Sequence, residues 1–272
     1  MEILIDTQNF PVHDVLDILL EDKTTKNNIM LATDSYKSIG ANYTSRSEMT
    51  VSAVNGMDPF ILQPRTSKTI DDQANRTKKR AEVFTPSWIC NKMNNYCDEE
   101  WFGRKDVFNV EAADSWTVND QIIEFPKNKS WQEYILSRRI EITCGEAPFV
   151  VSRYDASTGK LILPPKKRIG ILDRKLRIVN ENTDKEDDWL TWTYKAFQSV
   201  YGYEFQGDSL LIARVNLLMT FEDYLEDRWN RQAKNVELKK VSNIIAWNFW
   251  QMDGYTGTVP FSIKKHNEEQ LS

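Results

Sequence analysis

The sequence predicts an α/β fold built on a parallel sheet, and three observations predict it. From residue 81 onward, apolar segments typical of strands alternate with segments of helical periodicity. Their order is strand, helix, strand, helix, strand, which is typical of a parallel sheet with helices on both faces. The predicted strands end close to Gly145, Glu204 and Asp253. In parallel sheets, ligands bind at the carboxyl ends of the strands, so we expect the site there.

Composition excludes several classes of protein. The chain has 272 residues, of which 40% are hydrophobic and 28% charged, a balance typical of globular proteins and not of disordered ones. Its net charge of −5 neither requires nor excludes a nucleic-acid partner. No segment approaches the roughly 20 apolar residues that span a bilayer, so we expect no membrane partner and a cytoplasmic location. Three cysteines and two histidines match no zinc framework, so we expect no metal site.

Two regions differ in composition. Residues 1–80 are largely polar, and we expect them to form an amino-terminal arm that is partly helical, around 15–20, and loosely ordered. The end of this arm, residues 65–80, carries six basic residues and two acidic ones. It is either a solvated linker or a strip that contacts phosphates. Residues 81–272 form the predicted α/β domain, with an irregular insertion at 153–188.

Local signals place each element of this domain. Pro86 predicts a helix start, with Thr85 as its cap. Residues 139–151 predict a strand, a turn and the start of a helix. The remaining elements follow from the spacing of apolar residues: a helix over 189–201, a short strand over 201–205, a helix over 208–224 and a strand over 244–252.

The three strand ends carry residue types that bind a nucleoside. A turn at Gly145 lets a ligand approach the backbone closely, and amides at a following helix start can meet a carboxylate or a phosphate. Glu204 can accept two hydrogen bonds from ribose hydroxyls. Asp253 can accept one from an exocyclic amine. The glycine turn at Gly145 and the two acids, Glu204 and Asp253, follow one another along the chain in the order that such a site needs.

Four segments extend this pattern. Residues 81–93 contain Phe-Thr-Pro, and residues 141–149 read Glu-Ile-Thr-Cys-Gly-Glu-Ala-Pro-Phe. Residues 201–218 join Tyr-Gly-Tyr-Glu to Ala-Arg-Val-Asn-Leu-Leu, and residues 248–254 end in Met-Asp-Gly. Together they resemble the N6-adenine DNA methyltransferases of restriction–modification systems. The resemblance covers about residues 80–257.

The resemblance implies a Rossmann-like class I methyltransferase sheet, S-adenosylmethionine as cofactor and double-stranded DNA as partner. It places the Phe-Thr-Pro turn against the methionine end of the cofactor and Asp253 against the adenine. The cofactor-binding residues that it implies are Phe84, Thr85, Pro86, Glu141, Thr143, Cys144, Gly145, Phe149, Glu204 and Asp253.

The sequence departs from the family in the cofactor loop and in the catalytic motif. Ala147 replaces the second glycine of the loop, and Glu146 can repel the cofactor carboxylate if it points inward. The family's Asn/Asp-Pro-Pro-Tyr/Phe motif does not follow Asp253, and the nearest fragment, Asp-Pro-Phe at 58–60, lacks the second proline. The catalytic residues are therefore unknown and enzyme activity stays open. Three explanations of the missing motif are open. Either the chain continues beyond Ser272, or a partner such as a restriction, specificity or catalytic-half subunit supplies the motif, or the domain does not methylate.

A basic run in the insertion has two interpretations. Six basic residues face a single acidic one over residues 166–177, and the run is either a solvated loop or a DNA-phosphate contact: Lys166, Lys167, Arg168, Arg174, Lys175 and Arg177. A rival to the methyltransferase hypothesis is a non-catalytic DNA-binding or interaction subunit that retains the scaffold. A nicotinamide-dependent dehydrogenase is a third possibility, but the Gly-x-Gly-x-x-Gly turn it needs is missing.

Overall fold

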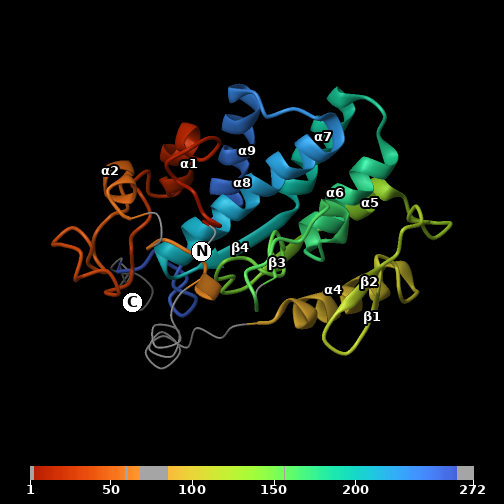
Figure 1. Cartoon of the computed structure of the whole chain (residues 1–272), viewed down its shortest axis with the longest axis horizontal. Helices are drawn as coiled ribbons and strands as arrows, with labels where there is room; N and C mark the ends of the chain where they lie inside the picture. Colours follow the sequence, from red (N-terminus) through yellow and green to blue (C-terminus); the bar gives the residue numbers. More distant parts are fainter. Residues whose placement is uncertain (1–2, 59–60, 68–84, 156, 262–272) are drawn as a thin grey trace, which may run out of the picture.

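The structure, a computed structural model, describes residues 3–58, 61–67, 85–155 and 157–261 (Figure 1). The elements before the main sheet are η1 (His13–Val15), α1 (Leu16–Leu20), α2 (Val51–Asn55), η2 (Arg65–Ser67), α4 (Ser87–Phe102), β1 (Asn109–Glu111), β2 (Trp116–Val118) and α5 (Trp131–Leu136). The elements from the main sheet onward are β3 (Arg139–Glu141), η3 (Pro165–Lys167), α6 (Ile171–Asn182), α7 (Glu186–Gln198), β4 (Val200–Glu204), α8 (Gly207–Trp229), α9 (Asn235–Asn248) and β5 (Phe249–Gln251).

Strands β3, β4 and β5 form a three-stranded parallel sheet, which confirms the predicted mixed α/β class and the parallel pairing. Their order in the sheet is the same as their order in the chain. The register pairs Glu141 with Gly202, and Glu204 with Gln251, so the carboxyl ends of neighbouring strands lie side by side. Strands β1 and β2 form a separate antiparallel pair.

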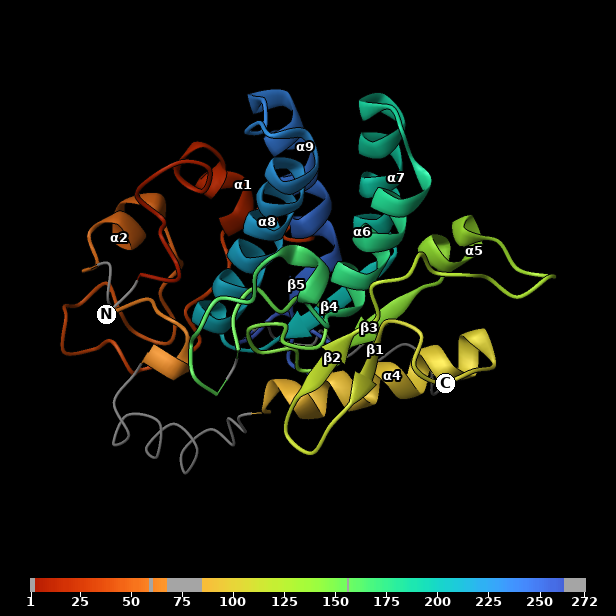
Figure 2. The ribbon, with the colours of Figure 1, turned by 45° about the vertical axis from the view of Figure 1, so that its right-hand side comes forward.

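The four helices that connect these strands lie on one side of the sheet (Figures 1 and 2). Connections between parallel strands are right-handed, so a strand order that never reverses places both crossovers on the same face. The opposite face carries Ile140, 54% exposed, with Tyr203 and Trp250 only partly buried. The expected sheet with helices on both faces is therefore not what the described residues form.

Helix α8 is the centre of the hydrophobic core. Most of its 23 residues are buried, and a helix that is covered on nearly all sides belongs in the interior of a fold. The ring of Phe221 on α8 lies 6.2–6.3 Å from the rings of Trp189, Tyr194 and Phe197 on α7. These aromatic contacts hold α7 and α8 together above the sheet.

The amino-terminal segment is packed more tightly than the sequence predicts. Val12, Leu16 and Leu19 are at most 1% exposed, and α1 packs against α8 and α9. The buried Arg214 of α8 donates hydrogen bonds to the carbonyls of Leu19 and Glu21. The described part of the expected loose arm is therefore part of the core, because its apolar residues cover the central helices. The strip at 65–80 lies mostly outside the described residues.

A close backbone contact fixes this segment beside the strand ends. A Cβ atom at Gly207 would lie 2.0 Å from the carbonyl oxygen of Met30, so only glycine allows the approach. Gln251, at the end of β5, accepts a hydrogen bond from the amide of Met30 at 2.7 Å and donates one to its carbonyl at 2.7 Å. The segment around Met30 thus lies against the carboxyl end of the sheet.

Several predicted elements have other bounds in the structure. The helix after Pro86 is confirmed, although Pro86 itself is the residue before the first turn and no side chain caps it. The insertion at 153–188 is not irregular, because it contains η3, α6 and the start of α7. Residues 244–248 are the end of α9, so the predicted strand over 244–252 reduces to β5. No helix begins at 149–151.

Candidate functional site

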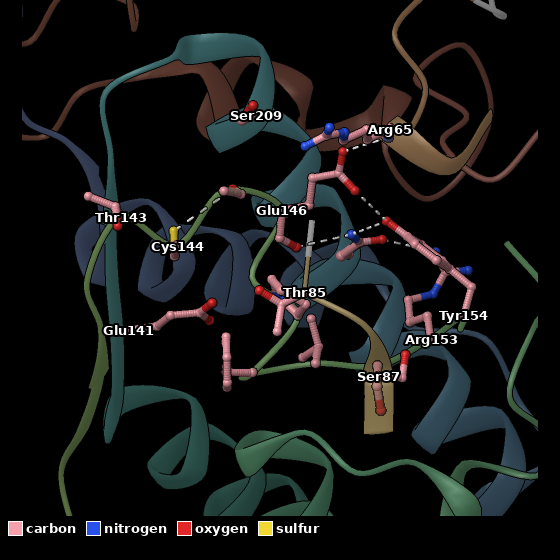
Figure 3. A pocket seen from close by; sticks show the side chains of 16 residues that line it. Arg65, Thr85, Ser87, Glu141, Thr143, Cys144, Glu146, Arg153, Tyr154 and Ser209 are labelled. Atoms are coloured by element: carbon pink, nitrogen blue, oxygen red, sulfur yellow. Dashed lines mark hydrogen bonds between the residues drawn. The ribbon is translucent and has the colours of Figure 1, made fainter. Parts of the chain in front are cut away.

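A pocket with a cavity volume of about 150 Å³, open to solvent, lies at the carboxyl end of β3 (Figure 3). Its walls come from the segment that follows β3, from the start of α4 and from one side of α8. The lining residues are Arg65, Thr85, Ser87, Glu141, Thr143, Cys144, Gly145, Glu146, Pro148, Phe149, Val151, Ser152, Arg153, Tyr154, Ser209 and Asn216.

The turn after β3 has an unusual backbone. Gly145 has a φ of 54°, and the flanking residues Thr143 and Ala147 also have positive φ values, of 50° and 62°. Left-handed conformations are strained for residues with a Cβ and especially for β-branched Thr. Ala147 adopts a conformation that a glycine would adopt at lower cost. Strained residues of this kind cluster at ligand sites in proteins.

Glu204 holds this turn against the end of β4. Its Oε2 accepts the amide of Gly145 at 2.8 Å, and its Oε1 accepts the amides of Phe205 and Gln206 at 2.9 and 3.0 Å. The residue is 8% exposed, and burial raises the pKa of its carboxyl group against the effect of these three amides. The carboxylate therefore ties the glycine turn to the end of the next strand.

Glu141 presents a free carboxylate oxygen to the pocket. Its side chain points into the space between Thr85 and Cys144 (Figure 3), and the nearby backbone amides of Phe149 and Val150 act to lower its pKa. Its Oε2 is buried and has no hydrogen-bond partner among the described residues. Burial raises the pKa of Glu141 well above its usual 4.5, and the nearby charge of Glu204 adds to this. A ligand that donates a hydrogen bond or carries a positive charge would satisfy this oxygen.

Glu146 connects the pocket to the amino-terminal segment. Its Oε1 accepts the backbone amide of Arg65 at 2.8 Å, and its Oε2 accepts the Tyr154 hydroxyl at 3.3 Å (Figure 3). Asn216 of α8 donates to the Glu146 carbonyl at 3.3 Å and to the Tyr154 hydroxyl at 2.9 Å. The Glu146 carboxylate is thus engaged with protein donors at the pocket wall.

The structure brings together most of the predicted cofactor residues. Six of them line the pocket: Thr85, Glu141, Thr143, Cys144, Gly145 and Phe149. Pro86 precedes α4 next to Thr85, Glu204 lies under the turn, and Phe84 lies outside the described residues. Sequence reasoning did not assign Arg65, Ser87, Ser152, Arg153, Tyr154, Ser209 and Asn216 to the site. Of these, Ser87 lies in the segment 81–93, and Ser209 and Asn216 lie in the segment 201–218, which both carry the resemblance, and Arg65 begins the basic strip at 65–80.

Asp253 is not among the residues that line the pocket. Its Oδ1 accepts the amide of Tyr255 at 2.8 Å, and its backbone pairs with Thr258. A carboxylate that accepts the amide two residues later is a common way to stabilise a turn. In this structure the side chain of Asp253 forms a turn after β5.

The basic run at 166–177 is not a surface patch. Four of its six residues are at most 5% exposed: Arg168, Arg174, Lys175 and Arg177. Arg168 pairs with Asp223 at 2.6 Å, Arg174 pairs with Asp98, and Arg177 pairs with Glu181 at 2.7 Å. These buried pairs correct the expectation that all six residues contact DNA, because charges inside a fold cannot reach phosphates. Lys166, beside Asp120, and Lys167 remain at the surface.

Other chemistry finds little support in the described part of the chain. The described ranges contain no cluster of three residues suited to hold a metal ion, and none of their helices is long and apolar enough to cross a bilayer. Burial raises the pKa of the Cys144 thiol well above its usual 9.0, so this cysteine is a poor nucleophile. Comparison with family models, with curated proteins and with solved structures finds no match for this chain.

Proposed function

We propose that the chain is an S-adenosylmethionine-binding domain of the methyltransferase type, with DNA adenine N6 as the acceptor that the sequence resemblance implies. One observation carries the proposal: a left-handed glycine turn at the end of one parallel strand is hydrogen-bonded to an acid at the end of the next, beside a pocket. Ligands of parallel sheets bind at this edge. The order of the three strands also agrees with a half of a Rossmann-like sheet.

The residues of the pocket suit the methionine end of this cofactor. Glu141 offers a buried oxygen without a partner, which fits the α-ammonium group. The hydroxyl group of Thr85, which lines the pocket just before α4, can donate a hydrogen bond to the cofactor carboxylate. Glu204 keeps an acceptor position on Oε2 for a ribose hydroxyl. When bound, the cofactor supplies a methyl group on a sulfonium ion.

The rival function, a non-catalytic interaction subunit on the same scaffold, has an observation of its own in favour. All of the hydrogen bonds that the structure gives to the Glu204 carboxylate come from the backbone, and Asp253 forms a turn. Both acids thus have structural roles that need no cofactor. In this alternative the domain folds and binds a partner but does not bind S-adenosylmethionine.

Isothermal titration calorimetry with S-adenosylmethionine and S-adenosylhomocysteine separates the two. We expect the wild-type chain to bind, and Glu141→Ala to bind about 10- to 150-fold more weakly, because it removes a hydrogen bond to a charged group, which contributes about 1.5–3 kcal/mol. Glu226→Ala, at an exposed position on α8, is the matched control and should bind like wild type. If wild type binds neither compound, the methyltransferase-type proposal is wrong and the interaction subunit is favoured.

A further inference from the structure

Strand β3 forms an open edge of the sheet. Its only partner in the described part of the chain is β4. The amide of Arg139 donates to the Ser199 carbonyl at 3.0 Å, so Arg139 and, two residues on, Glu141 direct their backbone groups to β4. In a parallel ladder, the residue between them directs its amide and carbonyl to the other side. The backbone of Ile140 therefore faces outward, and no described residue pairs with it.

Apolar side chains flank this edge. Ile140 and Ile142 are 54% and 62% exposed on the face of the sheet that the helices leave bare. Beyond the edge, Met93 and Tyr96 of α4 are 54% and 65% exposed. An open groove joins the two elements, because Tyr96, Cys97 and Trp101 of α4 line it together with Arg139. Isolated exposed apolar residues are ordinary, but several gathered around the unpaired edge of a strand indicate an interaction site.

The edge also carries positive charge. Arg138 is exposed, Arg139 is half-buried, and neither has a salt-bridge partner within the described ranges. Lys129 lines the groove beside Arg139, where its Nζ lies 4.6 Å from the ring centre of Trp101. Glu100 is the one acidic residue among those that line the groove. The start of the strand therefore favours an acidic neighbour.

We infer that β3 pairs with an extended segment of a partner protein, a strand with alternating apolar residues and an acidic residue beside Arg138 and Arg139. Only an extended backbone can match the outward amide and carbonyl of Ile140, and addition of a strand to a sheet edge is a common mode of protein recognition. Alternation follows from the geometry of strands, because every second side chain would lie on the face of Ile140.

A second copy of this chain fits the edge less well than a different protein does. Two-fold pairing of β3 with the β3 of a second copy would bring a second Arg138–Arg139 pair to the same short ladder. The strand has three residues and is about 10 Å long, so the two pairs of charges would lie within about one Debye length of each other. Like charges on neighbouring strands repel each other. One further step rests on the proposed function: a partner docked here lies beside the pocket and is the natural source of the residues that hold the methyl acceptor.

A synthetic peptide, acetyl-Glu-Thr-Val-Thr-Val-Thr-Glu-amide, tests the edge on the full chain, and its two acidic ends accommodate either strand direction. Fluorescence anisotropy of labelled peptide gives Kd, and hydrogen exchange measured by NMR reports on the Ile140 amide. We expect exchange at Ile140 to slow about tenfold when the peptide is present at about nine times its Kd. A peptide with Lys in place of both Glu residues should bind about two- to fivefold more weakly.

Variants of this chain make the test specific. Ile140→Pro removes the outward amide without touching the bonds to β4, and Ile140→Asp places a negative charge beside the acidic peptide. Both should abolish binding, whereas Ile122→Asp, at an isoleucine that is 72% exposed, should not. Unaltered binding of the peptide by both Ile140 variants, or no slowing at Ile140, overturns the docking edge. A dimer that protects Ile140 without peptide overturns the choice of partner. Calorimetry with S-adenosylmethionine on the same variants tests the pocket separately.

Discussion

Glu141 and Glu204 end two neighbouring strands, and their carboxylates are used differently. Glu204 accepts three backbone amides, so its charge is balanced by the chain itself. Glu141 keeps one buried oxygen without a partner, and the pKa of both acids is raised by burial. A cationic or hydrogen-bond-donating ligand should therefore gain most from Glu141, while Glu204 mainly shapes the turn.

Lys175 is a buried lysine, and no carboxylate among the described residues forms a salt bridge with it. Its Nζ donates to the carbonyls of Ile135 and Ser137 at 2.9 and 2.5 Å and to the hydroxyl of Ser199 at 2.6 Å. Burial lowers the pKa of Lys175 to about 7, and the charge of Arg139 adds to this. The ammonium group joins the ends of α5 and α7 next to β3.

We predict that Lys175 makes stability rise with pH above about 7. The unfolded chain keeps the lysine protonated up to a pKa of about 10.5, whereas the folded chain releases the proton near 7, so the unfolded state binds more protons in this window. The effect is at most about 1.4 kcal/mol per pH unit. Urea unfolding at pH values from roughly 6.5 to 9.5 measures the free energy of unfolding over most of this window. This free energy should rise with pH for wild type and should not show that rise for Lys175→Met. Parallel curves for the two proteins would contradict this, and Lys167→Met is the surface control.

At the scale of elements, α6 turns a basic stretch of sequence into interior structure. A window around Arg174 contains only Asp173 as an acidic neighbour, so the stretch resembles a solvated or DNA-binding loop. Folding supplies partners from distant elements: Asp98 of α4 lies 76 residues before Arg174. Arg174 also donates to Asn91 at 2.9 Å and to Asn95 at 2.7 Å. This network joins α4 to α6.

We predict that Arg174→Ala destabilises the fold by about 3–5 kcal/mol, because it leaves Asp98 as an uncompensated buried charge. Lys166→Ala, in the same basic run but at the surface, should change stability by about 0.5 kcal/mol or less. Chemical denaturation of the two variants measures both values. An equal and small loss in the two would mean that the run is a solvated surface after all, and that α4 and α6 are joined by other contacts.

Local signals in the sequence predict the parts of this fold that are local. Gly145 and Glu204 could be placed because a turn and an acid after a strand are readable within a few residues. The boundary between α9 and β5 could not, because Ile244 and Ile245 fit a helix or a strand equally well. The position of Arg65 beside Glu146 was also unpredictable, since it depends on a contact between segments 81 residues apart.

At the scale of the whole molecule, one face of the sheet is covered by helices and the other face is exposed. Helices α6–α9 and the amino-terminal segment cover one face and share one hydrophobic core. The other face and the edge of β3 expose Ile140 and Ile142. Under the proposed function, the covered side of the sheet is sufficient to bind a nucleoside at the carboxyl ends of the strands, whereas methyl transfer also needs groups that hold the acceptor.

This division leads to the last prediction: the purified chain binds S-adenosylmethionine but transfers little or no methyl group to DNA. The exocyclic amine of adenine is a poor nucleophile, because its lone pair is delocalised into the ring. Transfer requires acceptors that draw electron density onto the nitrogen and align it with the sulfonium methyl, and such positioning contributes several kcal/mol to catalysis. The sequence contains no Asn-Pro-Pro-aromatic segment, and Pro164-Pro165 is followed by Lys166.

Incubation of the chain with labelled S-adenosylmethionine and unmethylated DNA measures this directly. A complete adenine methyltransferase serves as positive control, and calorimetry on the same preparation establishes that the cofactor is bound. We expect label in DNA at the level of the protein-free blank. Because cofactor binding alone leaves the reacting amine unaligned, saturating the pocket with cofactor should not raise the amount of label in DNA. Incorporation into adenine well above the blank by this chain alone would show that its own residues hold the acceptor, and Glu141→Ala would then be expected to lower that incorporation.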